Sequence, residues 1–215
     1  MKTPIDQRPL PACRPAVQLR RQEEILDMAI GLFAKHGYFE TDTQLLADQL
    51  HVGKGTLYRY FRTKEELFLA AADSIMRKLH ERIVSATAGV EDPLDLIREG
   101  VYAYLAFFAE HPEYAELVIQ ERALFKDRPR PTYLQHRDVN EVRWRELYRS
   151  LAAKGEIRDM PAERITDIIG DLLYGTMYTN LFAQQRKSPE AQTSAILDVV
   201  FYGILSDSER QRRGP

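Results

Sequence analysis

Cysteine is almost absent from this chain of 215 residues, because Cys13 is its only one. A single thiol allows neither an internal disulfide nor a multi-cysteine metal site. Long apolar runs are also missing. The longest uncharged stretch, residues 172–185, includes Thr, Asn and Gln and is too short to span a bilayer. The first twenty residues lack the apolar segment of a secretory signal. We therefore expect a cytoplasmic protein that does not associate with membranes.

Sequence signatures of enzymes are missing as well. There is no Gly-x-Ser-x-Gly or His-Glu-x-x-His pattern, and no two of the five histidines are three or four residues apart. Residues 53–56, Gly-Lys-Gly-Thr, resemble the end of a phosphate-binding loop, but Asp48 stands where that loop needs glycine. Asp167 and Asp171, one helical turn apart, can bind a metal, although a polar edge of a helix interface explains them better. We expect no catalysis, no metal and no cofactor.

What the chain does contain is typical of a helical globular protein. Hydrophobic residues make up 44%, which is enough for a packed core. No segment alternates as a strand does, and apolar residues recur at helical spacing, so we expect an all-α fold. Its parts are expected to be a flexible arm (1–18), a helix-turn-helix domain (19–79), a helical bundle (80–206) and a frayed tail (207–215). Helix-start and helix-stop signals predict longer helices at 63–84, 93–111, 113–126, 132–154, 161–185 and 188–205.

Residues 42–61 carry the most informative pattern. Leu46 and Leu50 belong to one apolar stripe, and Leu57 and Phe61 form another at i, i+4 spacing. The segment between them, 51–53, is too short for anything but a turn, so the pattern predicts a helix-turn-helix. No acidic residue occurs from position 54 to 64, although the whole chain has a net charge of −2. A basic second helix suits the DNA major groove.

An ordered series of residues in this region resembles the DNA-binding domain of the TetR/AcrR family of bacterial transcriptional regulators. The resemblance extends over residues 19–79. It rests on Ala29, Leu32-Phe33, Gly37-Tyr38, Thr41, Leu46-Ala47, Val52, Lys54-Gly55-Thr56-Leu57-Tyr58, Tyr60-Phe61 and Lys64-Glu65-Glu66-Leu67. His51 stands where the family usually has Gly, and Gly53 where it has Ser or Thr. His tolerates a left-handed turn, and Gly is a weaker but acceptable N-cap.

The resemblance implies two kinds of DNA contact. The positions that match phosphate-binding ones are Thr43, Tyr58, Tyr60 and Lys64. Those that match base-reading ones are Gln44 and Lys54, with Gly55 and Thr56 closest to the groove. For the two tyrosines the alternative is packing in the core, and for Lys64 it is a place in the capping turn of the next helix.

The C-terminal half is rich in aromatic residues at helical spacing, most of which we expect in the core. A pocket between bundle helices with aromatic walls is nevertheless the expected ligand site. It suits a mostly apolar or aromatic effector, because no cluster of cations is present. The residues predicted to line it are Tyr104, Phe108, Trp144, Tyr148, Tyr174 and Tyr178.

Two further predictions complete the interpretation. The last two helices hold more apolar residues than one bundle face needs, which indicates a homodimer, although packing inside the subunit is the alternative. The interface residues predicted are Ile168, Leu172, Ile196, Val199, Val200 and Gly203. By function we expect a ligand-responsive repressor that leaves a palindromic, double-stranded operator when a small-molecule effector binds. The competing interpretation is a helical enzyme or ligand carrier whose helix-turn-helix is vestigial.

Overall fold

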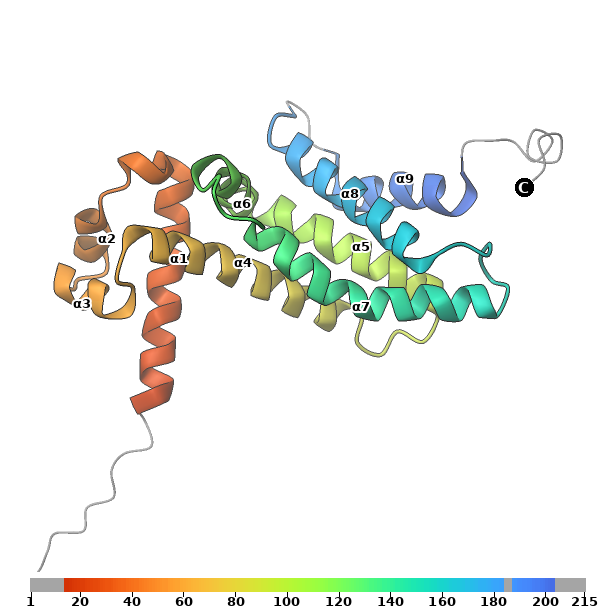
Figure 1. The fold of residues 1–215 in the computed structure, drawn as a ribbon, viewed down its shortest axis with the longest axis horizontal. Coiled ribbons are helices and arrows are strands. Elements are labelled where there is room, and N and C mark those ends of the chain that lie inside the picture. The colour runs from red at the N-terminus through yellow and green to blue at the C-terminus, as the bar shows by residue number, and fades with distance from the viewer. Residues whose placement is uncertain (1–13, 184–186, 204–215) are drawn as a thin grey trace, which may run out of the picture. The chain divides into compact units, whose positions relative to one another are not determined.

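Helices make up the regular structure of the described chain (Figure 1), as the sequence predicts. The computed structural model describes residues 14–183 and 187–203, with side chains from residue 18 onward. In chain order the helices are α1 (Arg14–Glu40), α2 (Thr43–Gln49), α3 (Lys54–Tyr60), α4 (Lys64–Ala86), α5 (Pro93–Glu110), α6 (Pro112–Leu124), α7 (Thr132–Ala153), α8 (Ala162–Asn180) and α9 (Pro189–Tyr202).

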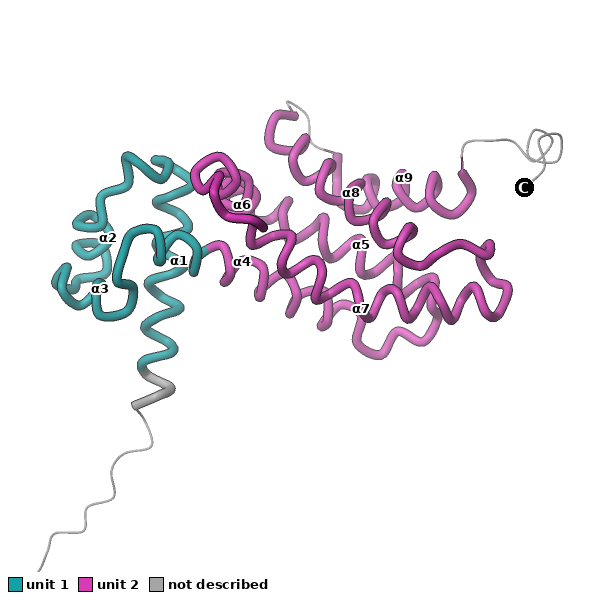
Figure 2. Tube along the Cα trace, in the orientation of Figure 1, with its two compact units in different colours: residues 1–71 teal, residues 72–215 magenta. Residues whose placement is uncertain are grey.

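The chain divides into two compact units (Figure 2): an N-terminal unit, residues 1–71, and a C-terminal unit, residues 72–215. The boundary lies inside α4, eight residues before the domain boundary expected after residue 79. A continuous amphipathic helix contains no turn residue or change of composition at such a point. Its sequence therefore gives no signal for the boundary.

Aromatic rings form the core of the N-terminal unit. Phe33 and Phe68 are fully buried, and their ring centroids lie 5.0 Å apart in an edge-on arrangement. Near the end of α1, Gly37 adopts φ 76°, a value that glycine takes without steric cost. The buried Thr41 hydroxyl, 2.6 Å from the Gly37 carbonyl and 3.2 Å from the Leu32 carbonyl, ties the chain back onto α1 at this break.

The helix ends differ from the expected ones in three places. The first helix begins at Arg14, inside the segment expected to be an arm, because the proline at position 15 suits a first helical turn. α8 ends at Asn180 rather than near residue 185. After Asn180, the backbone N–H groups of Leu181 and Phe182 donate to carbonyls three residues earlier, as in a 3₁₀-helix, and these bonds tighten the last turn. α9 ends at Tyr202, since Gly203 turns to φ 71°. Residues 1–13 and the expected tail lie outside the described residues.

α5 is the central helix of the C-terminal unit. Asp92 caps its start by accepting from the backbone N–H groups of Leu94 and Asp95, and every residue from 103 to 108 is buried. α5 packs against α8 and α9, and α7 packs against α8. None of the described helices is both long and apolar enough to cross a bilayer.

Candidate DNA-binding surface and ligand cavity

The turn between α2 and α3 has the geometry of a helix-turn-helix. Asp42 caps α2 by accepting from the Gln44 backbone N–H at 2.7 Å. His51 takes the left-handed conformation expected of it, with φ 53°. Gly53 is the N-cap of α3 and supplies no side-chain hydrogen bond, so only its extended backbone, at φ −70° and ψ 145°, starts that helix. Both departures from the family pattern are thus accommodated without disturbing the motif.

The residues predicted to contact DNA differ in exposure. Among them, Gln44, Lys54, Gly55 and Tyr58 are exposed, Thr56, Tyr60 and Lys64 are half-buried, and Thr43 is buried. No other atom comes within 4 Å of a Cβ built on Gly55, so the backbone of α3 is open there to close approach by another molecule.

Three of these side chains hold one another or neighbours in place. The hydroxyl oxygens of Thr43 and Tyr58 lie 3.2 Å apart and join α2 to α3. The Lys54 ammonium is 3.9 Å from the Asp42 carboxylate, and both side chains remain largely exposed. A pair so exposed to solvent is weak. Lys54 can therefore leave Asp42 for a stronger anion at little cost.

Lys64 is bound within its own unit. Its ammonium donates to the Phe39 carbonyl at 3.0 Å and lies 4.9 Å from the centre of the Tyr38 ring. Both contacts connect the start of α4 to the end of α1. This favours a structural contribution from Lys64 beside the predicted phosphate contact. The capping box of α4 is nevertheless formed by Thr63, whose hydroxyl accepts from the Glu66 N–H.

One residue that supports the helix-turn-helix, Arg21, was not predicted from the sequence. The Arg21 guanidinium donates to the Leu50 carbonyl at 2.7 Å and to Glu24 at 2.5 Å. It thereby satisfies a carbonyl at the C-terminal end of α2, where a positive charge is also favoured by the helix dipole. A separation of 29 residues leaves no local pattern from which this contact could be predicted.

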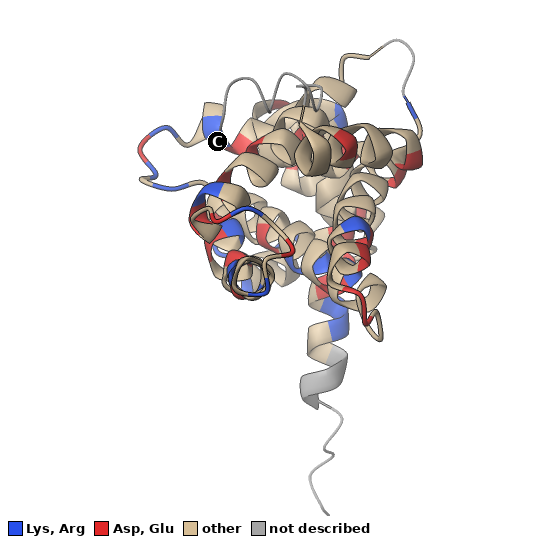
Figure 3. Ribbon diagram, turned by 90° about the vertical axis from the view of Figure 1, so that its right-hand side faces the viewer, with Lys and Arg blue, Asp and Glu red and all other residues tan. Residues whose placement is uncertain are grey.

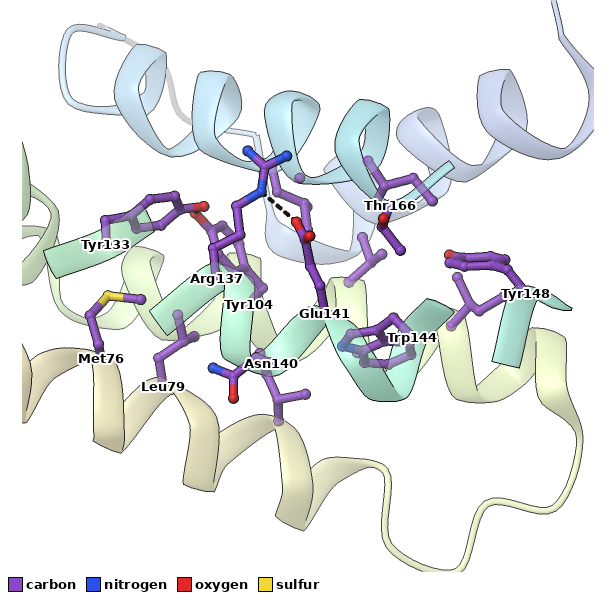
Figure 4. A pocket seen from close by; sticks show the side chains of 17 residues that line it. Met76, Leu79, Tyr104, Tyr133, Arg137, Asn140, Glu141, Trp144, Tyr148 and Thr166 are labelled. Atoms are coloured by element: carbon purple, nitrogen blue, oxygen red, sulfur yellow. Dashed lines mark hydrogen bonds and ion pairs between the residues drawn. The ribbon is translucent and has the colours of Figure 1, made fainter. Parts of the chain in front are cut away.

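The C-terminal unit encloses a cavity of about 120 Å³ between α4, α5, α7 and α8 (Figure 4). Of the six aromatic residues predicted to line a pocket, Tyr104, Trp144 and Tyr148 line this cavity. Phe108 lines a second, smaller hollow beside α6 and α8. Tyr174 and Tyr178 line neither; Tyr174 packs on Tyr133, and Tyr178 is exposed.

The indole of Trp144 occupies a place that only glycine leaves open. A Cβ added to Gly100 of α5 would lie 2.5 Å from the Trp144 ring, closer than real Cβ contacts allow. Gly100 therefore admits the ring against the α5 backbone. This explains why Trp144 forms part of the cavity wall.

Two tyrosines at one end of the cavity are linked through their hydroxyl groups. The hydroxyl oxygens of Tyr104 and Tyr133 lie 3.0 Å apart. Burial raises the pKa of Tyr104 well above its ordinary value and that of Tyr133 to about 12. Both phenols are therefore neutral at physiological pH. They share one hydrogen bond, and the Tyr104 hydroxyl can also donate to the Met177 sulfur, 3.7 Å away.

A network of charges closes the side of the cavity that faces α8. The buried Glu141 accepts from Arg137 at 2.6 Å and from Arg145 at 2.5 Å. Arg137 also donates to Asp171 at 2.7 Å and to the Asp167 carbonyl at 3.1 Å. Burial disfavours the charged Arg137, but hydrogen bonds to Glu141 and Asp171 outweigh it and raise its pKa. The two aspartates considered as a metal site thus form the polar edge that the sequence favoured.

The backbone of α8 makes room for this network at Gly170. A Cβ there would lie 2.8 Å from the Arg137 guanidinium. The sequence showed the i, i+4 spacing of Arg137, Glu141 and Arg145, but exposed helix faces have the same spacing. Their burial has no sequence signal.

Elsewhere along the helices, Lys and Arg are interspersed with Asp and Glu (Figure 3). Within the described ranges, no three His, Cys, Asp or Glu side chains group as metal ligands do.

The predicted interface residues remain largely uncovered in the single chain. Ile168 is 48% exposed, Leu172 40% and Val199 50%, whereas Ile196 and Val200 are half-buried. Gly203 is exposed and ends α9. Three exposed aromatic side chains lie on or just after the same two helices, namely Tyr178, Phe182 and Tyr202.

Comparison with known proteins identifies the N-terminal region. The family described as bacterial regulatory proteins, tetR family, matches residues 25–71. The probable acrEF/envCD operon repressor of Escherichia coli K12 is 30% identical over 118 residues, which are 52% of each chain. The uncharacterized HTH-type transcriptional regulator YuxN of Bacillus subtilis is 27% identical over 104 residues, 48% of this chain and 36% of YuxN. The chain thus spans about half or less of these relatives' length.

Solved structures share the fold over most of the chain. The fatty acid degradation regulator FadR from Bacillus halodurans superposes with a TM-score of 0.72 at 17% identity, covering 84% of this chain and 94% of that one. The TetR-family regulator PfmR from Thermus thermophilus gives 0.70 at 23% identity, covering 85% and 99%. FadR from Bacillus subtilis in complex with stearoyl-CoA gives 0.67 at 19% identity, covering 85% and 99%. Identities this low establish the arrangement of helices alone.

Proposed function

We propose that this chain, which belongs to the TetR/AcrR family of bacterial transcriptional regulators, represses transcription as a homodimer that binds double-stranded operator DNA and leaves it when a small-molecule effector binds. One observation carries the proposal. The same chain has an open helix-turn-helix surface around α3 and an aromatic cavity in its C-terminal unit. A DNA reader and a ligand site are the two parts that such a regulator requires.

The proposed base-reading group is Lys54 at the start of α3. Its exposed ammonium can reach the O6 and N7 acceptors of guanine once it leaves Asp42. Lys54→Ala should cost about 1–3 kcal/mol at one or two base positions of the operator. The measurement is a binding isotherm for each single-base variant of a selected operator, with the exposed Lys35→Ala as control.

The distribution of the affinity loss in Lys54→Ala over the base positions of the operator distinguishes the possible roles of Lys54. A uniform loss over all sequences would make Lys54 a phosphate contact. A wild-type protein without specific DNA binding at any salt concentration would support the enzyme or carrier interpretation. Operator binding should also weaken steeply as salt rises, because cations are released from DNA when basic side chains neutralise phosphates.

The proposed effector site is the aromatic cavity, and the effector is a mostly apolar or aromatic molecule. Trp144 is the only tryptophan and lines the cavity, so its fluorescence reports binding there. Effector should change this fluorescence and lower operator affinity over the same concentration range, because the coupling between two sites is reciprocal. A fluorescence change with unaltered operator affinity would leave the cavity as a binding site without a regulatory role.

The proposed partner on the exposed faces of α8 and α9 is a second copy of the chain. Two helices from each subunit form an interface in which the same patch meets itself. Val199→Glu should give monomers with native helicity and little operator affinity, because a charge there is buried against the partner copy. Val139 on α7, 74% exposed, provides the control as Val139→Glu. Sedimentation that showed both variants as dimers would place the interface elsewhere.

A further inference from the structure

Three polar groups along one face of α7 reach the cavity without a hydrogen-bond partner in the described part of the chain. They are the Asn140 amide, the Trp144 indole N–H and the Tyr148 hydroxyl. Residues four apart follow one another on the same face of a helix, so the three form a row about 12 Å long at 1.5 Å of rise per residue. Tyr148 is 5% exposed, so its hydroxyl has little access to water outside the cavity.

None of the three groups is among the fully buried polar atoms that lack a partner, so water can reach them while the cavity is empty. A ligand that displaces this water must replace its hydrogen bonds, or the group is left unsatisfied at the cost of its desolvation free energy. The remaining lining side chains from α4 and α5 are chiefly aliphatic, among them Met76, Leu79, Ile97 and Val101. Hence a molecule that offers hydrogen bonds to the row recovers a stabilisation that water-free apolar contact does not provide.

The charged groups of the cavity, by contrast, are already paired. Arg137 and Glu141 bind each other (Figure 4), and each has a second partner, Asp171 for Arg137 and Arg145 for Glu141. The Thr166 hydroxyl donates to the Glu163 carbonyl. A charged ligand would therefore have to break an existing ion pair or remain uncompensated in the wall.

We propose that the effector is an uncharged, ring-containing molecule with a hydrogen-bond acceptor such as a carbonyl oxygen, which the row Asn140–Trp144–Tyr148 recognises. This inference rests on the proposed function and specifies the effector's chemistry. The size of the cavity limits the ligand to one ring, because a cavity of about 150 Å³ accommodates benzene. The cavity here, about 120 Å³, is somewhat smaller, so a six-membered ring with a small polar substituent requires the lining side chains to shift.

Four one-ring compounds of similar size test the inference on the full-length protein: ethylbenzene, acetophenone, benzoate and benzylammonium. Calorimetry at pH 7 gives the dissociation constant of each. Acetophenone should bind about two- to tenfold more tightly than ethylbenzene, the range that one net hydrogen bond supplies. Benzoate and benzylammonium should bind more weakly than ethylbenzene.

Substitutions then test whether the preference for acetophenone over ethylbenzene depends on the row Asn140–Trp144–Tyr148. Asn140→Leu and Tyr148→Phe remove a hydrogen-bonding group at nearly constant volume, and the double variant should bind acetophenone no better than ethylbenzene. Tyr102→Phe is the matched control, because that hydroxyl is bonded to Glu190 outside the cavity. It should keep the full preference. Circular dichroism and thermal unfolding establish that each variant is folded. If the double variant does not fold, either single variant serves for the comparison of acetophenone with ethylbenzene.

Several outcomes would overturn the inference. They are tightest binding by benzoate or benzylammonium, binding of none of the four at millimolar concentration, or an unchanged preference in a folded variant. Operator binding by the unliganded protein is measured separately by fluorescence anisotropy. If the operator is bound while the ranking of compounds fails, the effector class is wrong and the regulatory function stands. If the operator is never bound but the ranking holds, the proposed function is wrong and the cavity's chemistry stands.

Discussion

The two units of this protein treat polar side chains in opposite ways. In the described part of the N-terminal unit, the buried polar residues are threonines, and every charged side chain lies at or near the surface. In the C-terminal unit, two carboxylates, Glu121 and Glu141, are 1% and 7% exposed. Each is bound to arginine. The DNA-binding surface thus contains no buried charge, whereas one wall of the cavity includes Glu141, which is buried and paired.

This difference implies unequal sensitivity to substitution. Removing one partner of a buried ion pair strands the other charge, whereas removing an exposed charge loses little. Substitutions that remove a single charge should therefore lower the stability of the C-terminal unit more than that of the N-terminal unit. The following variants measure that contrast, beginning with the largest expected effect.

Glu141→Gln should lower the free energy of unfolding by about 3 kcal/mol, because it leaves Arg137 and Arg145 without their shared counter-ion in a mostly buried site. Urea denaturation at fixed protein concentration measures the loss. Glu146→Gln is the control, since Glu146 is exposed on the same helix. Equal stability of the two variants would show that the network contributes no more than a surface pair.

Gly100→Ala and Gly31→Ala compare the same change in the two units. At Gly100 the new methyl group would meet Trp144 at 2.5 Å, so overpacking should cost about 1–3 kcal/mol and shift the tryptophan emission. At Gly31, inside α1, nothing lies within 4 Å. Alanine there should be neutral or stabilising by up to about 1 kcal/mol, from its helix propensity. An unshifted emission in Gly100→Ala would mean that the indole has another position of equal energy.

The same contrast explains how much the sequence could predict. His51, Gly53 and the stripes around Leu46 and Leu57 act through local backbone preference and periodicity, so the helix-turn-helix could be derived from adjacent residues. The aromatic wall was half predictable: Trp144 and Tyr148 line the cavity, but Tyr174 does not. Helical spacing gives the face of one helix. It does not give the rotation of that helix against three others.

The charged lining was beyond such reasoning for a related reason. Arg137 reaches Asp171 across 34 residues and lies against α8 only because position 170 is glycine. Nothing in the neighbourhood of either residue specifies that distance. By the same argument, the Asn140 amide could not be distinguished in sequence from an ordinary exposed asparagine. Its significance comes from the cavity that the other helices enclose.

Asp42 allows the capping and the charge of one residue to be separated in the N-terminal unit. Asp42→Ala removes the N-cap of α2 and should cost about 1 kcal/mol of unfolding free energy. Asp42→Asn keeps the cap and removes only the negative charge beside Lys54, so stability should hardly change while DNA affinity rises at low salt. Denaturation and anisotropy measure the two effects. Equal destabilisation by both variants would assign the stabilisation to charge.

The smallest expected effect concerns acid sensitivity at Asp73, which is half-exposed at the first residues of the C-terminal unit. Burial alone would raise the pKa of Asp73, but hydrogen bonds from His136, 2.7 Å away, and from Arg77 outweigh it and lower the pKa below 3.8. A carboxyl with a depressed pKa stabilises the folded state above its unfolded pKa, and this stabilisation is lost as pH falls through the folded value.

Asp73→Asn should therefore be slightly less stable than wild type at pH 6, and the difference should shrink as pH falls below about 4, where the wild-type carboxylate takes up its proton. The free energy of unfolding measured from pH 6 to 2 gives both curves. Asp127→Asn, an exposed change in the connector before α7, should follow the wild-type curve. Because solvent screens Asp73, the effect should be well below that of Glu141→Gln. A difference that persisted undiminished at the lowest pH would trace the stabilisation to the shape of the aspartate and its packing rather than to its charge.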